Sequence, residues 1–188
     1  MNKWDLLVQI NAMPNAKRSY RDEVTKFVTE NQETIPFLVE YTFGDQKKIA
    51  IRSSWILELV CLKNINYLAP KIDYFIANLN RPSDESILRP LAKICFLLVT
   101  ACDSKTDIAI KSKLTEAHKK RIIEVAFDWL INTHNVANQV YAMDTLFLLG
   151  KEYDWIPAEL KLVLEKHILS GSPGYQVRAK RILKNLNI

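Results

Sequence analysis

The stretch IPAELKLVLEKHILSGSPGYQVRAKRIL, residues 156–183, decides the fold. Apolar residues recur at intervals of three and four on both sides of a Gly-Ser-Pro-Gly turn at 171–174, and this is the spacing of amphipathic helices. Pro157 suits the first turn of a helix, where no amide donor is lost. The stretch therefore predicts two helices joined by a tight turn.

The same apolar spacing runs through almost the whole chain, and strict alternation of apolar and polar residues never lasts long. Proline, glycine and asparagine mark where the pattern stops. We expect an all-α protein of about ten helices, near 3–12, 16–30, 34–43, 47–62, 66–79, 86–102, 114–132, 136–149, 156–169 and 174–186.

The predicted helices repeat in pairs. The first helix of each pair carries an acid in an apolar or aromatic frame, at Glu40, Asp73, Asp128 and Glu165. The second helix carries a small or aromatic residue at a matching place, at Trp55, Ala92, Ala142 and Ala179. These matching places are 37, 50 and 37 residues apart, and the extra residues fall in a polar insertion near 104–114.

A unit of two helices cannot bury its apolar face alone, so neighbouring units are expected to stack. The sequence predicts one domain over 1–188 with the architecture of an α-α superhelix, a right-handed solenoid. About four units occupy 34–187, and the helices within 3–30 form an N-terminal cap because they fit the repeat poorly.

The pattern resembles HEAT and armadillo-like repeats. Val177-Arg178-Ala179 opens a second helix in the HEAT manner, and Ile51-Arg52 and Leu88-Arg89-Pro90 are similar. The resemblance covers 34–187, although Asn138-Gln139-Val140 stands where an arginine is expected. It implies a binding function along the concave face, which the second helices line.

The chain also resembles a group of short bacterial helical proteins, through stretches such as 89–95 and 146–156. Some members of this group carry an adenylosuccinate lyase label. That superfamily has a mobile Ser-Ser-x-Met-Pro-x-Lys-x-Asn loop in a far longer chain. Here Ser53-Ser54 is followed by Trp55-Ile56-Leu57 inside a predicted helix, so the residues do not support the label.

Composition excludes several classes of protein. The chain has 188 residues, of which 48% are hydrophobic and 25% charged, so it is not disordered or collagenous. No secretory signal is evident at the start, and charges interrupt the most apolar stretch, 49–62, so no membrane span is expected. Cys61, Cys95 and Cys102 lie in apolar helical patterns, which predicts reduced core thiols in a cytoplasmic protein.

The acid of each first helix and an arginine of the next helix form a recurring polar pattern. We expect charge-assisted hydrogen bonds between Glu40 and Arg52, between Asp73 and Arg89, and between Glu165 and Arg178. Asp128 lacks a matching arginine. Positions that depart from a repeated structural pattern are often functional, so Asp128 is a candidate functional residue.

Basic and aromatic side chains recur along one stripe of the second helices. The candidate binding residues, with the unpaired Asp128, are Arg52, Trp55, Arg89, Lys93, Asp128, Tyr141, Asp144, Arg178 and Arg181. The stripe also takes in Lys48, Phe96 and Tyr175. It favours a protein or peptide partner; the aromatic residues would alternatively belong to the core.

Two other functions stay open. A net charge of +5, with a second basic cluster at Lys105, Lys111, Lys113, Lys119, Lys120 and Arg121, permits binding to nucleic acid, as in HEAT-like DNA glycosylases. An enzyme would use Asp128 or Asp144 in the groove. Neither a metal nor a cofactor is predicted, because the three histidines lack zinc-ligand spacing and no phosphate-binding glycine motif occurs.

Overall fold

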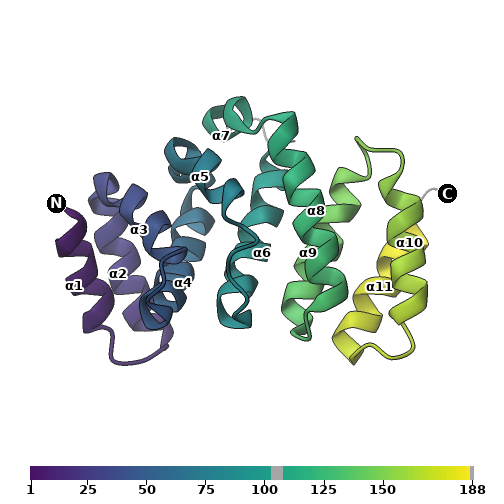
Figure 1. Ribbon diagram of the computed structural model, residues 1–188, viewed down its shortest axis with the longest axis horizontal. Coiled ribbons are helices and arrows are strands. Elements are labelled where there is room, and N and C mark those ends of the chain that lie inside the picture. The colour runs from purple at the N-terminus through teal and green to yellow at the C-terminus, as the bar shows by residue number, and fades with distance from the viewer. Residues whose placement is uncertain (103–107, 187–188) are drawn as a thin grey trace. The chain divides into compact units, whose positions relative to one another are not determined.

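The computed structural model describes residues 1–102 and 108–186, and these residues form helices and connecting turns with no β-strand (Figure 1). The predicted all-α class is confirmed. The chain divides into two compact units, Met1–Leu114 and Thr115–Ile188, and each is described by itself.

The first unit consists of seven α-helices and two 3₁₀ helices among its described residues. In chain order its elements are α1 (Lys3–Ala12), α2 (Arg18–Glu30), η1 (Gln32–Thr34), α3 (Ile35–Thr42), α4 (Lys47–Lys63), η2 (Ile65–Lys71), α5 (Ile72–Ala77), α6 (Glu85–Cys102) and α7 (Ile108–Lys113). The 3₁₀ helix η1 lies between α2 and α3, and η2 lies between α4 and α5. The central element is α4, which packs against α1, α2, α3, α6 and η2. It is therefore buried around most of its circumference, with Ile56, Leu57 and Val60 fully inaccessible.

The second unit consists of two antiparallel helix pairs (Figure 1). Its elements are α8 (Glu116–Asn132), α9 (Val136–Leu149), α10 (Ile156–His167) and α11 (Pro173–Asn185). Here α9 is central and packs against the other three helices, with Met143, Leu146 and Leu149 fully buried.

The turn between α10 and α11 needs a glycine. A Cβ atom added at Gly171 would lie 2.5 Å from Cδ1 of Tyr175, a residue that is only 2% exposed. The Tyr175 ring packs directly on this backbone, which explains why the quoted turn begins with glycine.

Two segments differ from their prediction. The segment 66–79 is not one helix, since η2 gives way to α5 at Lys71; Pro70 has no amide hydrogen to continue the regular pattern. Part of the polar insertion forms α7, which packs against η2, with the Ile110 amide donating to Asn66 Oδ1 at 2.9 Å. This tertiary contact has no local sequence signal.

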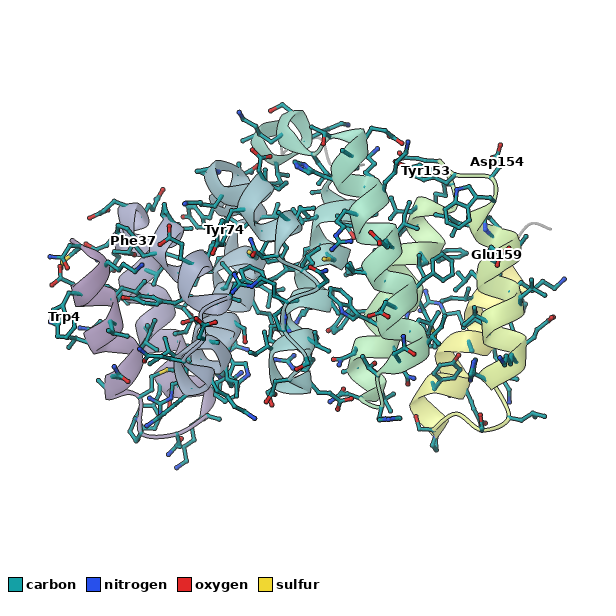
Figure 2. The ribbon with its side chains drawn as sticks, in the orientation of Figure 1. Trp4, Phe37, Tyr74, Tyr153, Asp154 and Glu159 are labelled. Carbon is teal, nitrogen blue, oxygen red and sulfur yellow. The ribbon has the colours of Figure 1, made fainter. Side chains whose placement is uncertain are left out.

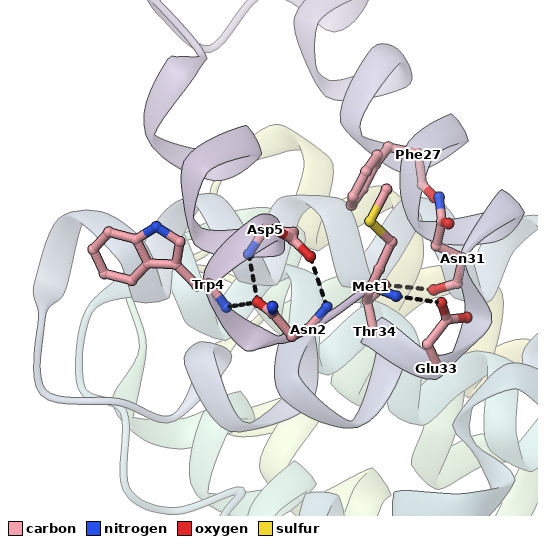
Figure 3. Close-up of polar contacts among 8 residues, drawn as sticks. All are labelled: Met1, Asn2, Trp4, Asp5, Phe27, Asn31, Glu33 and Thr34. Carbon is pink, nitrogen blue, oxygen red and sulfur yellow. Dashed lines mark hydrogen bonds and ion pairs between the residues drawn. The ribbon is translucent and has the colours of Figure 1, made fainter.

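The start of α1 is fixed by its side chains (Figure 3). The side chain of Asn2 accepts hydrogen bonds from the amides of Trp4 and Asp5, and Asp5 in turn accepts from the Asn2 amide at 2.8 Å. This capping box satisfies amides that the helix itself leaves unpaired. The amino group of Met1 donates to Glu33 at 3.1 Å and joins α1 to η1.

The cysteines largely follow the prediction. None of the three forms a disulfide in the described part of the chain; Cys61 and Cys95 lie in the core, and Cys102 is half-buried. Burial raises the pKa of both core thiols well above the ordinary range, so they are unreactive at neutral pH. Within the described ranges, no helix is both long and apolar enough to cross a bilayer.

Candidate binding face on the second helices

The second helices of the predicted pairs are α4 and α6 in the first unit and α9 and α11 in the second. On α4, a shallow pocket of about 430 Å³ is lined by Lys47, Lys48, Ile51, Arg52 and Trp55. These residues share one side of the helix because they recur at intervals of three and four. Trp55 is half-buried, and the Arg21 guanidinium of α2 lies 5.8 Å from its ring centroid, a cation–π distance.

Arg52 holds the first unit together from beneath this pocket. Its side chain is buried, at 8% exposure, and donates to the carbonyls of Ile10 and Asn11 at 3.0 and 3.2 Å. Those carbonyls lie at the end of α1, where the helix has no internal donors left. Arg52 therefore docks α1 onto α4 and contributes little of its charge to the surface.

The predicted pair between Glu40 and Arg52 is wrong. Glu40 instead accepts from Lys71 at 3.0 Å and from Lys3 at 3.1 Å. These bonds, led by the one from Lys71, lower the pKa of the Glu40 carboxyl. The arginine is already occupied by helix-end carbonyls, so the acid takes lysines from η2 and α1.

Arg89 and Lys93 on α6 share a carboxylate that sequence reasoning missed. Glu58 on α4 is nearly buried, and accepts from Arg89 Nη2 at 2.6 Å and Nη1 at 3.3 Å and from Lys93 Nζ at 3.1 Å. The predicted pair between Asp73 and Arg89 is therefore wrong. Glu58 joins consecutive second helices rather than the two helices of one pair.

The second unit contains a related cluster. Asp144 on α9 accepts from Arg178 of α11 at 3.1 Å, and Arg181 also acts on it electrostatically. Burial raises the pKa of Asp144, and the nearby Arg178 and Arg181 offset only part of that rise. The predicted pair between Glu165 and Arg178 is wrong, because Arg178 pairs with an acid on the preceding second helix, as Arg89 does in the first unit.

The two clusters follow one rule. In each, a carboxylate on one second helix interacts with two basic side chains on the next second helix. Arg89 and Lys93 follow Glu58 by 31 and 35 residues. Arg178 and Arg181 follow Asp144 by 34 and 37 residues. The acids follow the repeat positions Trp55 and Ala142 by three and two residues. An acid just after the repeat position was therefore the sequence signal by which these clusters could have been found. One acid and two basic side chains give each cluster a net charge of +1.

Several other candidate residues lie apart from these clusters. Asp128 is exposed on α8, a first helix, where it accepts from Asn132 of the same helix at 2.7 Å. Tyr141 is half-buried on α9, whereas Tyr175 is a core residue. Of the second basic cluster, Lys105 lies outside the described residues.

Within residues 1–102 and 108–186, no three His, Cys, Asp or Glu side chains are grouped so that they could hold a metal ion. The chain matches no protein-family model, no curated protein and no solved structure.

Proposed function

We propose that this is a non-catalytic interaction protein with HEAT-like stacked helix pairs, which binds a protein or peptide segment on the face of its second helices. In support, consecutive second helices in both units are joined by the same acid–base arrangement. A regular array of this kind presents side chains at regular intervals along an extended partner.

The pocket at Trp55 carries the proposal. A half-exposed tryptophan beside an apolar Ile51 provides a place for one apolar side chain of a partner, and tryptophan is among the residues that dominate binding at interfaces. Lys48 at its rim is exposed and forms no ion pair within the described residues. The pocket therefore favours a segment with an apolar side chain next to acidic ones.

Charge favours such a segment over nucleic acid. Arg89 and Lys93 are shared with Glu58, and Arg178 with Asp144. A protein that follows a phosphate backbone needs several uncompensated cations, since each contacted phosphate requires one. With a net charge of +1 per cluster and carboxylates between the cations, the face is better matched to a mixed peptide.

The test begins with selection of binders from a random peptide library on the immobilised full chain. The affinity of the selected peptides is then measured by fluorescence anisotropy. We expect acidic residues around an apolar one, and a loss of affinity of about tenfold or more in Trp55→Ala and Lys48→Glu. Lys26→Glu is the matched control, because Lys26 is exposed on α2 and lies about 140° around that helix from Arg21.

A mixed-sequence DNA duplex is titrated in parallel at low and high salt. Two results together would favour the nucleic-acid alternative and reject the proposal. The duplex would bind with an affinity that falls steeply with salt, and the selected peptides would bind Trp55→Ala and Lys48→Glu as tightly as the wild type. Unfolding of Trp55→Ala would show instead that Trp55 is a core residue, and Lys48→Glu, on an exposed side chain, then decides the question alone.

A further inference from the structure

An apolar pocket of about 450 Å³ lies in the second unit, on the first helix α8 rather than on the second helices. It is lined by Lys120, Ile123, Glu124, Phe127, Tyr153 and Trp155. The first four belong to α8 and the last two to the loop between α9 and α10. The volume lies within the range of ordinary ligand sites.

Two aromatic rings form the wall of this pocket. The rings of Phe127 and Trp155 are stacked, with centroids 5.9 Å apart and planes 21° from parallel. Although Trp155 packs on Phe127, it is still 52% exposed. A large aromatic surface held open to solvent is a common mark of an interaction site.

The loop that carries Trp155 is held in place by hydrogen bonds. The amide of Tyr153 donates to the Leu149 carbonyl at 3.0 Å, and the amide of Ile156 to the Tyr153 carbonyl at 3.0 Å. The Tyr153 hydroxyl donates to Glu116 on α8 at 2.7 Å. Figure 2 labels Tyr153 on this loop, next to Asp154. The pocket is therefore formed before any ligand arrives, which reduces the entropy cost of binding.

The shape suits a chain segment. The α8 residues of the pocket lie along one side of the helix from Lys120 to Phe127, a length of about 10 Å. Ile131, one turn further on, is 48% exposed and continues the apolar surface. An elongated, open surface of this kind accommodates a peptide better than an enclosed cavity would.

One of the three cations of α8 around the pocket has no ion pair among the described residues. Lys119 is paired with Glu152, and Arg121 with Glu124. Lys120, which lines the pocket and is exposed, forms no hydrogen bond or ion pair within the described part of the chain. An aromatic group with an adjacent negative charge would therefore be complementary to the site.

We propose that this pocket is a second docking site, which takes an aromatic side chain of a partner protein that is flanked by acidic residues. The ring would lie against Trp155 and Phe127, and a neighbouring carboxylate would approach Lys120. This site is separate from the second-helix face, so it stands or falls independently of the function proposed above.

The test is an amide-resolved NMR titration of the full chain with capped tripeptides. Glu-Trp-Glu is expected to shift the Trp155 indole and the backbone amides of Lys120 and Phe127. Lys-Trp-Lys and Glu-Ala-Glu should bind at least about fivefold more weakly, because each lacks one of the two matching features. Lys120→Ser and Trp155→Ala should each weaken Glu-Trp-Glu by a similar factor.

Lys180→Ser is the matched control, since Lys180 is an exposed lysine on α11 of the same unit and forms no ion pair with the residues that the structure describes. Equal binding of Lys-Trp-Lys, an unchanged affinity in Lys120→Ser, or shifts confined to other residues would overturn the proposal. Tighter binding of indole-3-acetate than of Glu-Trp-Glu would also overturn it, because the pocket would then be a small-molecule site. If Trp155→Ala loses its folded spectrum, Lys120→Ser on the exposed rim still decides.

Discussion

The Glu58 cluster of the first unit and the Asp144 cluster of the second use the same arrangement with different strength. Glu58 has three contacts with two cations and a side chain only 5% exposed, whereas Asp144 has one hydrogen bond and a side chain 16% exposed. Burial outweighs pairing at Asp144 and raises its pKa. A repeated acid–base pattern therefore does not imply a repeated contribution to stability.

Of the substitutions that test this difference, Glu58→Gln should lower the free energy of unfolding the most. Glutamine keeps the shape but removes the negative charge that accepts from Arg89 and Lys93. Losing the charge of so deeply buried an acceptor costs about 3 kcal/mol of unfolding free energy. Urea denaturation followed by circular dichroism measures the loss. A change below about 1 kcal/mol would show that Arg89 and Lys93 reach water and that the cluster is a surface feature.

The two units also differ at their glycines. Gly171→Ala should cost about 2 kcal/mol, because the new methyl group would overlap the buried Tyr175 ring. Gly44→Ala is the matched variant in the first unit, where the nearest atom to an added Cβ is the Tyr41 carbonyl oxygen at 3.5 Å, an ordinary contact. Gly44→Ala should be neutral or stabilising by about 0.5 kcal/mol. Thermal unfolding of both variants checks the contrast, and equal losses would contradict it.

Asp144→Asn should change stability at pH 7 by less than about 1 kcal/mol, in contrast to Glu58→Gln. Because the folded-state pKa of Asp144 is raised, this group contributes most stability below its unfolded value near 3.8 and loses it as pH rises through the folded value. The asparagine variant should therefore lose less stability than the wild type between pH 3.5 and 7. Urea unfolding at several pH values measures this difference, and a larger loss in the variant would contradict it.

The smallest effects are expected at Glu40, where the pKa is lowered. Its contribution is present above the unfolded value near 4.5 and is lost as pH falls through the folded value. Lys71→Met should raise the Glu40 pKa more than Lys3→Met does, since the hydrogen bond from Lys71 is the leading cause of the shift. Each variant should cost about 0.5 kcal/mol at neutral pH. Carboxyl NMR titration ranks the two, and the reverse order would refute the assignment.

Helix positions were readable from the sequence because apolar spacing and punctuation are local signals. The predicted helices at 3–12 and 136–149 have the observed bounds. The break between η2 and α5 was missed although Pro70 marks it, and α7 was missed because its order depends on η2 and Asn66. Contacts between distant segments decide such cases.

The candidate face was only partly readable. Arg89, Lys93 and Arg178 were found from their spacing. The partners of Arg89 and Arg178 were sought within one helix pair, whereas Glu58 and Asp144 join consecutive second helices. Arg52 was selected as a surface residue, and periodicity alone does not show that the end of α1 covers it. The Trp155 pocket went unnoticed because it depends on a loop meeting α8.

The central claim, that a partner segment docks beside Trp55, is tested most directly by amide-resolved NMR with a peptide selected on the full chain. The account predicts that the largest shifts fall on Lys48, Ile51 and Trp55 and disappear in Lys48→Glu but not in Lys26→Glu. Shifts of equal size in both variants, or shifts that leave these three residues untouched, would contradict it.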